Sequence, residues 1–180
     1  LLGGVRGILV TDRWNAYNGW PVRLRQLCWA HLKRHFQAFS EWGGEIAKIG
    51  EALLEEVDRM FEGWHRVRDG TWARSTFRAF MGPLRRRMER LLEQGAAGRH
   101  EKAAGMCREI LILRRALWTF VRVPGVEPTN NTSERAIRGA VIWRKISFGT
   151  HSEQGSRFVE RMLTVSVTLR QQGRNVFDYV

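Results

Sequence analysis

The stretch GILVTDRWNAYN, residues 7–18, decides how the fold is interpreted. Residues 8–10 form a short apolar run with two β-branched members, which is typical of a buried parallel strand. The run is followed by Asp12. A carboxylate in that position is either an ordinary turn residue or helix cap, or a functional group placed at the edge of a sheet. The remainder of the sequence has to distinguish these two interpretations.

The charge balance of the chain points to a polyanionic partner. Its 180 residues include 30 Lys and Arg against 18 Asp and Glu, a formal net charge of +12. A domain with this excess attracts nucleic acid, and the alternative is a generic basic surface. Cys28 and Cys107 do not make a disulfide framework and fit a reducing cytosol. No apolar stretch approaches the ~20 residues that cross a bilayer, so no membrane partner is expected.

Apolar spacing predicts the elements that follow Asp12. Alternating apolar and charged residues over 21–29, PVRLRQLCW, predict a second strand with one face in solvent. The spacing then becomes helical over 30–42, AHLKRHFQAFSEW. A helical block follows, with apolar stripes that predict three helical segments, over 46–67, 77–95 and 101–121.

Proline and glycine mark several boundaries in the second half of the chain. Pro83 is expected to start or kink its helix, and Gly95 to mark the end of that helix. A loop rich in proline precedes another helix, expected from about Ser133. A possible strand over 143–149, WRKISFG, and a last amphipathic helix over 154–172 complete the pattern.

Glu134 is the second carboxylate in a chemically suggestive setting. It lies in PTNNTSERAIRGAVIWRKISFGT, residues 128–150, three positions after Asn131. That spacing is close to a capping box, in which the acid stabilises the start of a helix. Arg135 and Arg138 flank the acid, and an acid among bases suits a site that holds a divalent metal and a phosphodiester together. Capping and catalysis are compatible, and both stay open.

Four motifs, in this order, resemble transposases of the insertion-sequence 66 family. The resemblance covers nearly the whole chain. Such proteins belong to the DDE transposases, whose catalytic domain has a ribonuclease-H-like fold, often with an insertion before the last acid. The motifs are TDRWNAYN (11–18), CWAHLKRHF (28–36), NNTSERAIR (130–138) and RKISFGTHSEQGSRF (144–158).

The resemblance implies an α/β fold with a partial ribonuclease-H-like core, mostly helical in this chain, interrupted by an all-α insertion. The two parts of the core are expected at 1–42 and 123–180, and the insertion at 43–122. Asp12 corresponds to the family's second acid and Glu134 to its third. The family's first Asp lies on an earlier strand that no residue here matches. We therefore expect a C-terminal part of the enzyme, inactive alone.

By the same resemblance the chemistry is metal-dependent DNA strand cleavage and strand transfer. Asp12 and Glu134 are expected to hold Mg²⁺, with Mn²⁺ as the alternative ion. Water cuts at the transposon end, and the 3′-hydroxyl so released attacks target DNA. The expected partners are the transposon ends, target DNA and further copies of the chain. The expected location is the bacterial cytoplasm, in association with the nucleoid.

Cys28 and His31 form a C-x-x-H pair, similar to a motif found between the second and third acids of several such families. If 21–29 is the strand beside 8–10, His31 starts its helix near the crevice into which Asp12 points. A zinc site with His35 as third ligand competes with this interpretation. A closed zinc site needs four ligands, and only Cys107 is left as a thiolate, which favours a supporting role.

The remaining candidates are polar side chains around the two acids. Two further hypotheses stay open beside the catalytic one. The chain is a non-catalytic DNA-binding remnant, or its helical block serves oligomerisation. The supporting residues are expected to be His31, Asn131 and Arg138, and the DNA-binding residues Lys33, Arg34, Arg135, Arg144 and Lys145.

Overall fold

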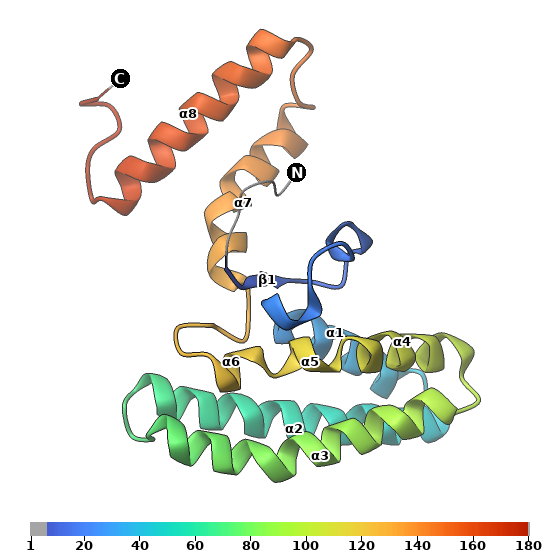
Figure 1. Cartoon of the computed structure of the whole chain (residues 1–180). Helices are drawn as coiled ribbons and strands as arrows, with labels where there is room; N and C mark the ends of the chain where they lie inside the picture. Colours follow the sequence, from blue (N-terminus) through green and yellow to red (C-terminus); the bar gives the residue numbers. More distant parts are fainter. Residues whose placement is uncertain (1–6, 180) are drawn as a thin grey trace. The chain divides into compact units, whose positions relative to one another are not determined.

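The computed structural model describes residues 7–179 and separates the chain into two compact units. The first unit spans Leu1–Asn130 and the second Asn131–Val180. Most of the described residues are helical, and the strands among them form a single two-stranded sheet in the first unit (Figure 1). An α/β composition is therefore confirmed in part, while the ribonuclease-H-like core stays a prediction.

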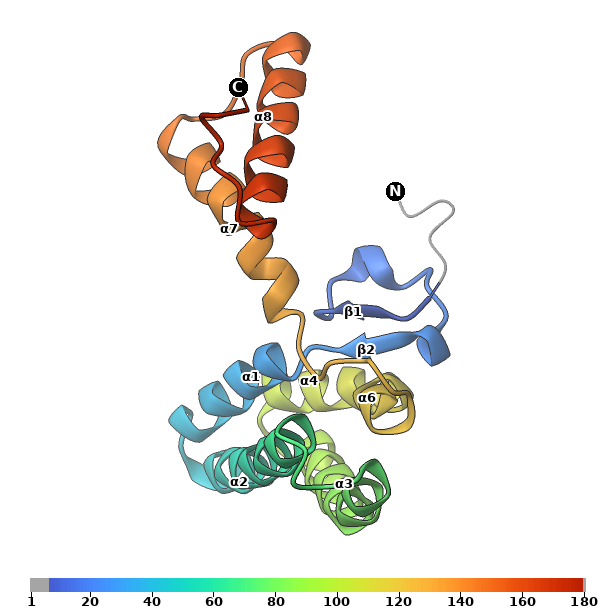
Figure 2. The same cartoon turned by 90° about the vertical axis from the view of Figure 1, so that its left-hand side faces the viewer.

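The sheet pairs the apolar run at the start of the chain with a strand whose residues lie sixteen positions later. β1 (Leu9–Thr11) and β2 (Arg25–Leu27) are parallel, with Leu9 opposite Arg25 and Thr11 opposite Leu27 (Figure 2). Two 3₁₀ turns, η1 (Asn15–Tyr17) and η2 (Val22–Leu24), carry the connection between them. The predicted strand before Asp12 and its parallel neighbour are both confirmed.

The second strand is shorter and more buried than the alternation predicts. Val22 and Leu24 belong to η2, because the Leu24 amide donates to the carbonyl of Pro21 at 2.8 Å and closes a tight turn. All three residues of β2 are buried, so the expected solvent face does not exist. The polar side chains of this strand find partners inside the protein: Gln26, for example, hydrogen-bonds to the backbone of residues 117 and 120.

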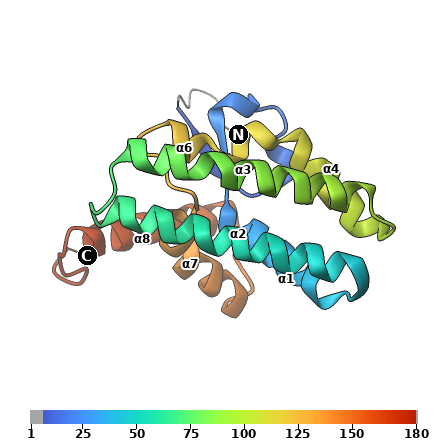
Figure 3. The ribbon, with the colours of Figure 1, turned by 90° about the horizontal axis from the view of Figure 1, so that it is seen from below.

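Long helices pack side by side below the sheet. α1 (Trp29–Glu41) contacts α2 (Gly44–Arg68), α2 contacts α3 (Arg74–Ala97), and α3 contacts α4 (Glu101–Ile112). Figure 3 shows α2 and α3 side by side along their length. The predicted apolar stripes form their common core, in which Leu53, Val57, Met60, Phe77 and Leu84 are almost wholly buried. The helical block is therefore confirmed as a packed helical layer.

Three details of the helical layer differ from the sequence expectation. α3 starts at Arg74 and passes through Pro83, so this proline does not begin the helix. Gly95 does not end it either, since α3 continues to Ala97. Gly95 is instead buried where a Cβ would come within 2.7 Å of the Cys107 sulfur. The expected segment 101–121 is broken into α4, α5 (Arg114–Leu117) and α6 (Thr119–Arg122).

The second unit consists of two helices. α7 (Asn131–Ile146) and α8 (Glu153–Gln171) match the predicted helices. The possible strand over 143–149 is wrong, because α7 continues to Ile146 and the Ser147 amide still donates to the carbonyl of Trp143 at 2.8 Å. The apolar side of α7 is largely exposed. Among the described residues of this unit, Leu169 of α8 alone is buried.

Within residues 7–179, no helix combines the length and the apolar character that a membrane span requires.

A close contact between α1 and α2 leads to a stability prediction. A Cβ on Gly50 would lie 2.5 Å from the Ser40 nitrogen and 2.8 Å from the Phe39 Cβ. Gly50→Ala is therefore expected to lower the free energy of unfolding by about 1–3 kcal/mol through overpacking. Urea unfolding followed by circular dichroism measures this change.

Gly105, in the middle of α4, is the matched control because a Cβ there meets no atom within 4 Å. Gly105→Ala should raise the free energy of unfolding by up to about 1 kcal/mol, through helix propensity alone. Equal destabilisation by both substitutions would contradict the close packing of α1 on α2.

Candidate functional site

Asp12 directly follows β1 and is held there by the backbone. Its Oδ1 accepts a hydrogen bond from the Trp14 amide at 2.9 Å, and its side chain is half-buried. Its carbonyl oxygen accepts from the Thr11 hydroxyl at 2.8 Å. The carboxylate therefore has the turn role expected of such a residue. That role also fixes its position at the carboxyl edge of the sheet, so the turn and functional interpretations are compatible.

His31 lies at the same edge of the sheet. The Cys28 amide, directly after β2, donates to the Thr11 carbonyl at 2.7 Å, so both strands end side by side. α1 begins at Trp29, which places His31 in its first turn. The structure therefore brings His31 to the strand ends where Asp12 is located, as the parallel pairing predicts. Its supporting role stays a prediction.

Arg25 is a residue of this region that the sequence pattern missed. It is 1% exposed, and its Nη2 lies 3.4 Å from both the Thr11 hydroxyl and the Asp12 carbonyl. Burial lowers the pKa of this guanidinium, while Asp12 and Tyr17 oppose the shift. The alternation around it predicts a solvent face for Arg25. The side chain is buried because all three residues of β2 are covered.

Arg13 ties the turn after Asp12 to two helices. Its Nη1 forms an ion pair with Glu109 of α4 at 2.6 Å, and its Nη2 lies 3.3 Å from Nε2 of His35 in α1. The pKa of His35 is lowered chiefly by burial, then by the charges of Arg13, His31 and Arg34, against an opposing effect of Glu109. A neutral His35 accepts the hydrogen bond from Arg13. Arg13 therefore connects the turn to both α1 and α4.

The alternative of a zinc site depends on whether Cys107 and the other candidate ligands can bind a metal. Cys107 is buried, close to Gly95 in the helical layer, and burial raises the pKa of its thiol to about 11. At neutral pH this thiol is protonated and a poor metal ligand. In the part of the chain that the structure describes, no group of three or more His, Cys, Asp or Glu side chains is arranged to hold a metal ion.

Glu134 lies in the first turn of α7, in the second unit. α7 begins at Asn131, whereas a helix capped by the Asn131 side chain would begin one residue later. Arg135 and Arg138 of the same helix are exposed. Asp12 belongs to the first unit and Glu134 to the second. The meeting of the two carboxylates, like the supporting roles of Asn131 and Arg138, therefore stays a prediction.

The predicted phosphate contacts are basic side chains at the surface. Lys33 forms an ion pair with Asp58 of α2, so its charge is partly balanced. Arg34 of α1 and Arg144 and Lys145 of α7 are exposed. Exposed cations of this kind contribute to binding a polyanion without fixing its sequence.

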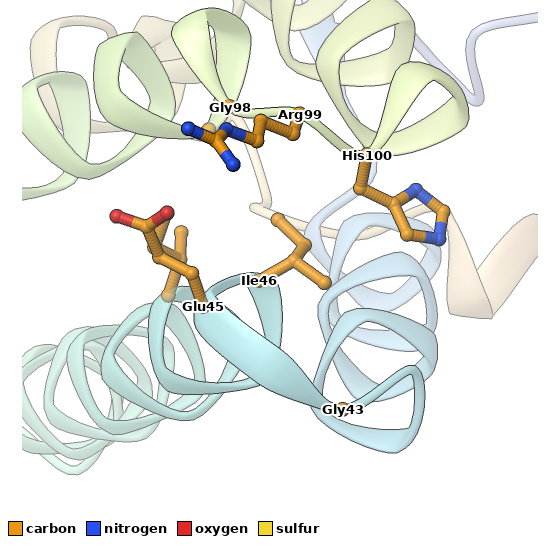
Figure 4. A pocket seen from close by; sticks show the side chains of 8 residues that line it. Gly43, Glu45, Ile46, Gly98, Arg99 and His100 are labelled. Atoms are coloured by element: carbon orange, nitrogen blue, oxygen red, sulfur yellow. The ribbon is translucent and has the colours of Figure 1, made fainter.

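Two pockets among the described residues of the first unit bear on the position of the site. One of about 350 Å³ adjoins the turn after Asp12 and is lined by Arg13, Asn15, Arg25 and Glu109, among others. The other, of about 230 Å³, lies between the start of α2 and the α3–α4 turn (Figure 4). It lies beyond the far end of α1, which is 13 residues or about 20 Å long, and is therefore separate from the turn after Asp12.

The second pocket has its own polar rim. Glu45 and Arg99 extend toward each other across it, and His100 lies at its side (Figure 4). His100 caps α4 by accepting from the Ala103 amide at 3.3 Å and stacks on Trp42 with ring centroids 4.5 Å apart. These contacts give His100 a structural role at the end of the helical layer.

Comparison with known proteins agrees with the motifs. A family model described as "Transposase IS66 family" matches residues 1–158. The chain is also 30% identical to the uncharacterized protein y4qI of Sinorhizobium fredii, in an alignment that covers 99% of this chain and 35% of that protein. The chain thus spans about a third of the length of this curated relative. No solved structure matches it significantly.

The lowered pKa of His35 predicts how stability depends on pH. The native state binds fewer protons at His35 than the unfolded chain, so stability decreases as pH falls through its ordinary pKa of 6.5. We expect the melting temperature to fall by a few degrees between about pH 7 and pH 5, and His35→Gln to remove part of that fall. Thermal unfolding followed by circular dichroism measures both.

His151→Gln, at an exposed position in the second unit, serves as the control and should keep the dependence of the wild type. The burial of a neutral His35 beside Arg13 is ruled out if wild type and His35→Gln have the same profile.

Proposed function

The chain belongs to the IS66 family of transposases, and we propose that it supplies part of the site that cuts and joins DNA during transposition. The observation that carries this proposal is the position of Asp12 at the carboxyl edge of a parallel strand pair, with His31 starting the next helix at the same edge. Open α/β sheets place their functional groups outside this edge.

The proposed chemistry needs a divalent cation, Mg²⁺ or alternatively Mn²⁺. Asp12 and Glu134 are its proposed ligands, because carboxylate oxygens are the donors that these hard ions prefer. Oδ1 of Asp12 accepts a hydrogen bond from the Trp14 amide. Within residues 7–179 no hydrogen bond to Oδ2 is present, so Oδ2 is left as an oxygen ligand for an ion. Bound there, the cation supplies Lewis-acid activation of the attacking water or 3′-hydroxyl and of the leaving oxygen.

The residues of the chain have separate tasks in this proposal. The Trp14 amide orients the Asp12 carboxylate, and Arg13 anchors the turn to α1 and α4. His31 is proposed to contact the scissile phosphate or to orient a metal ligand. The basic residues of α1 and α7 are proposed to hold the DNA backbone, as the net charge of +12 favours.

The proposed partners are the transposon ends, target DNA and further copies of the chain in the active assembly. A reaction on chromosomal DNA places the protein with the nucleoid in the bacterial cytoplasm. The alternative from the sequence, a non-catalytic DNA-binding remnant, shares the basic surface but needs neither carboxylate. Substitution of the two acids therefore separates the two functions.

Neutralising either acid tests the catalytic role. In the intact gene product, Asp12→Asn and Glu134→Gln should each reduce strand cleavage at the transposon end to the level seen without metal, because each removes a metal ligand. DNA binding measured by gel shift should change less than about threefold, since neither substitution removes a cation. The intact product is required because the matched motifs supply only two of the family's three acids.

Glu160→Gln in α8 is the matched control and should leave cleavage unchanged, because this exposed acid lies outside the matched motifs. Cleavage at the wild-type rate by either Asp12→Asn or Glu134→Gln would overturn the catalytic assignment and favour the DNA-binding remnant.

The proposed backbone contacts of α7 make a separate prediction about salt. Loss of each phosphate contact should reduce the slope of log affinity against log salt concentration by about one. The double variant Arg144→Gln/Lys145→Gln should therefore bind duplex DNA with a slope smaller by about two. Fluorescence anisotropy over a series of salt concentrations measures the slope.

Arg66→Gln is the control, because Arg66 pairs with Glu62 on α2 at 2.9 Å and its charge is already balanced. An unchanged slope in the α7 double variant would exclude these two residues as phosphate contacts.

A further inference from the structure

Trp14 is an anomaly in the otherwise well-buried first unit. Its side chain is 65% exposed. Among the described residues of this unit, only Ile112 is a comparably exposed large apolar side chain, whereas the other tryptophans are buried or half-buried. An indole that remains in water two positions after Asp12 contributes little to the core, and its position beside that carboxylate makes it accessible to a ligand of the same edge.

Two hydrogen bonds hold the backbone of Trp14, and one aromatic contact holds its ring. The Trp14 amide donates to Oδ1 of Asp12 at 2.9 Å, and its carbonyl accepts from the Tyr17 amide at 3.1 Å. The Tyr17 ring meets the indole edge to face, with centroids 5.9 Å apart and an interplanar angle of 82°. Arg13, next in sequence, is bonded to Glu109 and His35.

The contacts that fix Trp14 also leave it available for stacking. An edge-to-face neighbour covers at most one face of the indole, so the other can receive a flat group. The ring is also positioned before any ligand arrives, which reduces the entropy lost on binding. A fixed, exposed aromatic face beside a carboxylate is therefore suited to a planar ligand that carries a phosphate.

We propose that Trp14 stacks on an unpaired base of the DNA strand whose phosphodiester lies at Asp12. This inference rests on the proposed function, because it takes the DNA to be the ligand of this edge. Every base has a π-face, so an indole platform binds single strands without sequence preference. Two residues of chain span at most about 7 Å, which keeps the base near the phosphate that Asp12 serves.

Charge supports a nucleic acid over an apolar protein partner. Arg13 and the buried Arg25 flank the turn that carries Trp14, and the chain as a whole has a net charge of +12. Arg25 is buried and under the charge of Asp12, and Arg13 is paired with Glu109, so the attraction comes from the excess positive charge of the chain as a whole. A polyanionic strand responds to that charge, and its bases can stack on the ring.

The test measures binding of the 180-residue chain to a fluorescent single-stranded oligonucleotide of about 16 nucleotides, in EDTA so that no metal contributes. Trp14→Ala should weaken the affinity roughly tenfold, the usual effect of losing one stacked base. Trp14→Phe should recover most of it. Trp14→Leu, which keeps the apolar character without a π-face, should behave as Trp14→Ala.

Two controls make the outcome specific. Ile112→Ala removes the other exposed large apolar side chain of the unit, which lines the pocket beside the same turn but has no π-face, and it should bind as the wild type does. An abasic oligonucleotide of the same length should bind wild type and Trp14→Ala equally, because its phosphates remain but its bases are absent. Melting temperatures of all variants should agree, since Trp14 lies outside the core.

Wild-type affinity in Trp14→Ala, or full affinity in Trp14→Leu, would overturn the stacking role. A shift of Trp14→Ala from oligomer to monomer in light scattering, with unchanged DNA affinity, would also overturn it and assign the ring to contact between copies. Because the assay contains no metal and measures no cleavage, its failure is distinct from failure of the two acids.

Discussion

The fold of the first unit depends on one buried glutamine. Gln26, in the middle of β2, donates to the carbonyls of Leu27 at 2.7 Å and Leu117 at 3.1 Å, and it accepts from the Phe120 amide at 2.8 Å. The indole of Trp29 donates to the same Leu117 carbonyl at 2.9 Å. These bonds join the sheet to the end of the helical layer. Because an unpaired polar group is costly to bury, they also fix one register for β2.

The hydrogen bonds of Gln26 and Trp29 to residues 117 and 120 explain why the helix predicted over 101–121 is interrupted at Trp118. Once the Leu117 carbonyl and the Phe120 amide bond to side chains of β2 and α1, they no longer serve a continuous helix, and the chain divides into α5 and α6 around Trp118. The Thr119 hydroxyl adds a 2.6 Å bond to the Arg25 carbonyl. The break returns the chain to the sheet, where β2 holds β1, and β1 in turn positions Asp12 at the edge.

Sequence patterns predicted the elements whose stability is local or depends on one apolar face. The run before Asp12, its parallel partner and the amphipathic helices all belong to this class. The pattern failed for Arg25 because distant elements, α5 and α6, contact β2 and bury this side chain. It failed at Val22 and over 143–149 because apolar spacing does not reveal local hydrogen bonding. The Leu24 amide bonds to the Pro21 carbonyl, and the Ser147 amide bonds to the Trp143 carbonyl where α7 reaches Ile146.

Three departures from ordinary packing lie around one turn of this unit. Arg25 is a buried cation with long contacts, His35 has a lowered pKa, and Trp14 leaves an indole in water. Other departures lie elsewhere in the unit, since burial also lowers the pKa of Arg74 in α3. Folded chains often retain such departures at sites whose groups serve a ligand. The position of these three beside Asp12 therefore supports the function proposed for this edge, in addition to the family membership. The ligand proposed there is a DNA strand with one base stacked on Trp14.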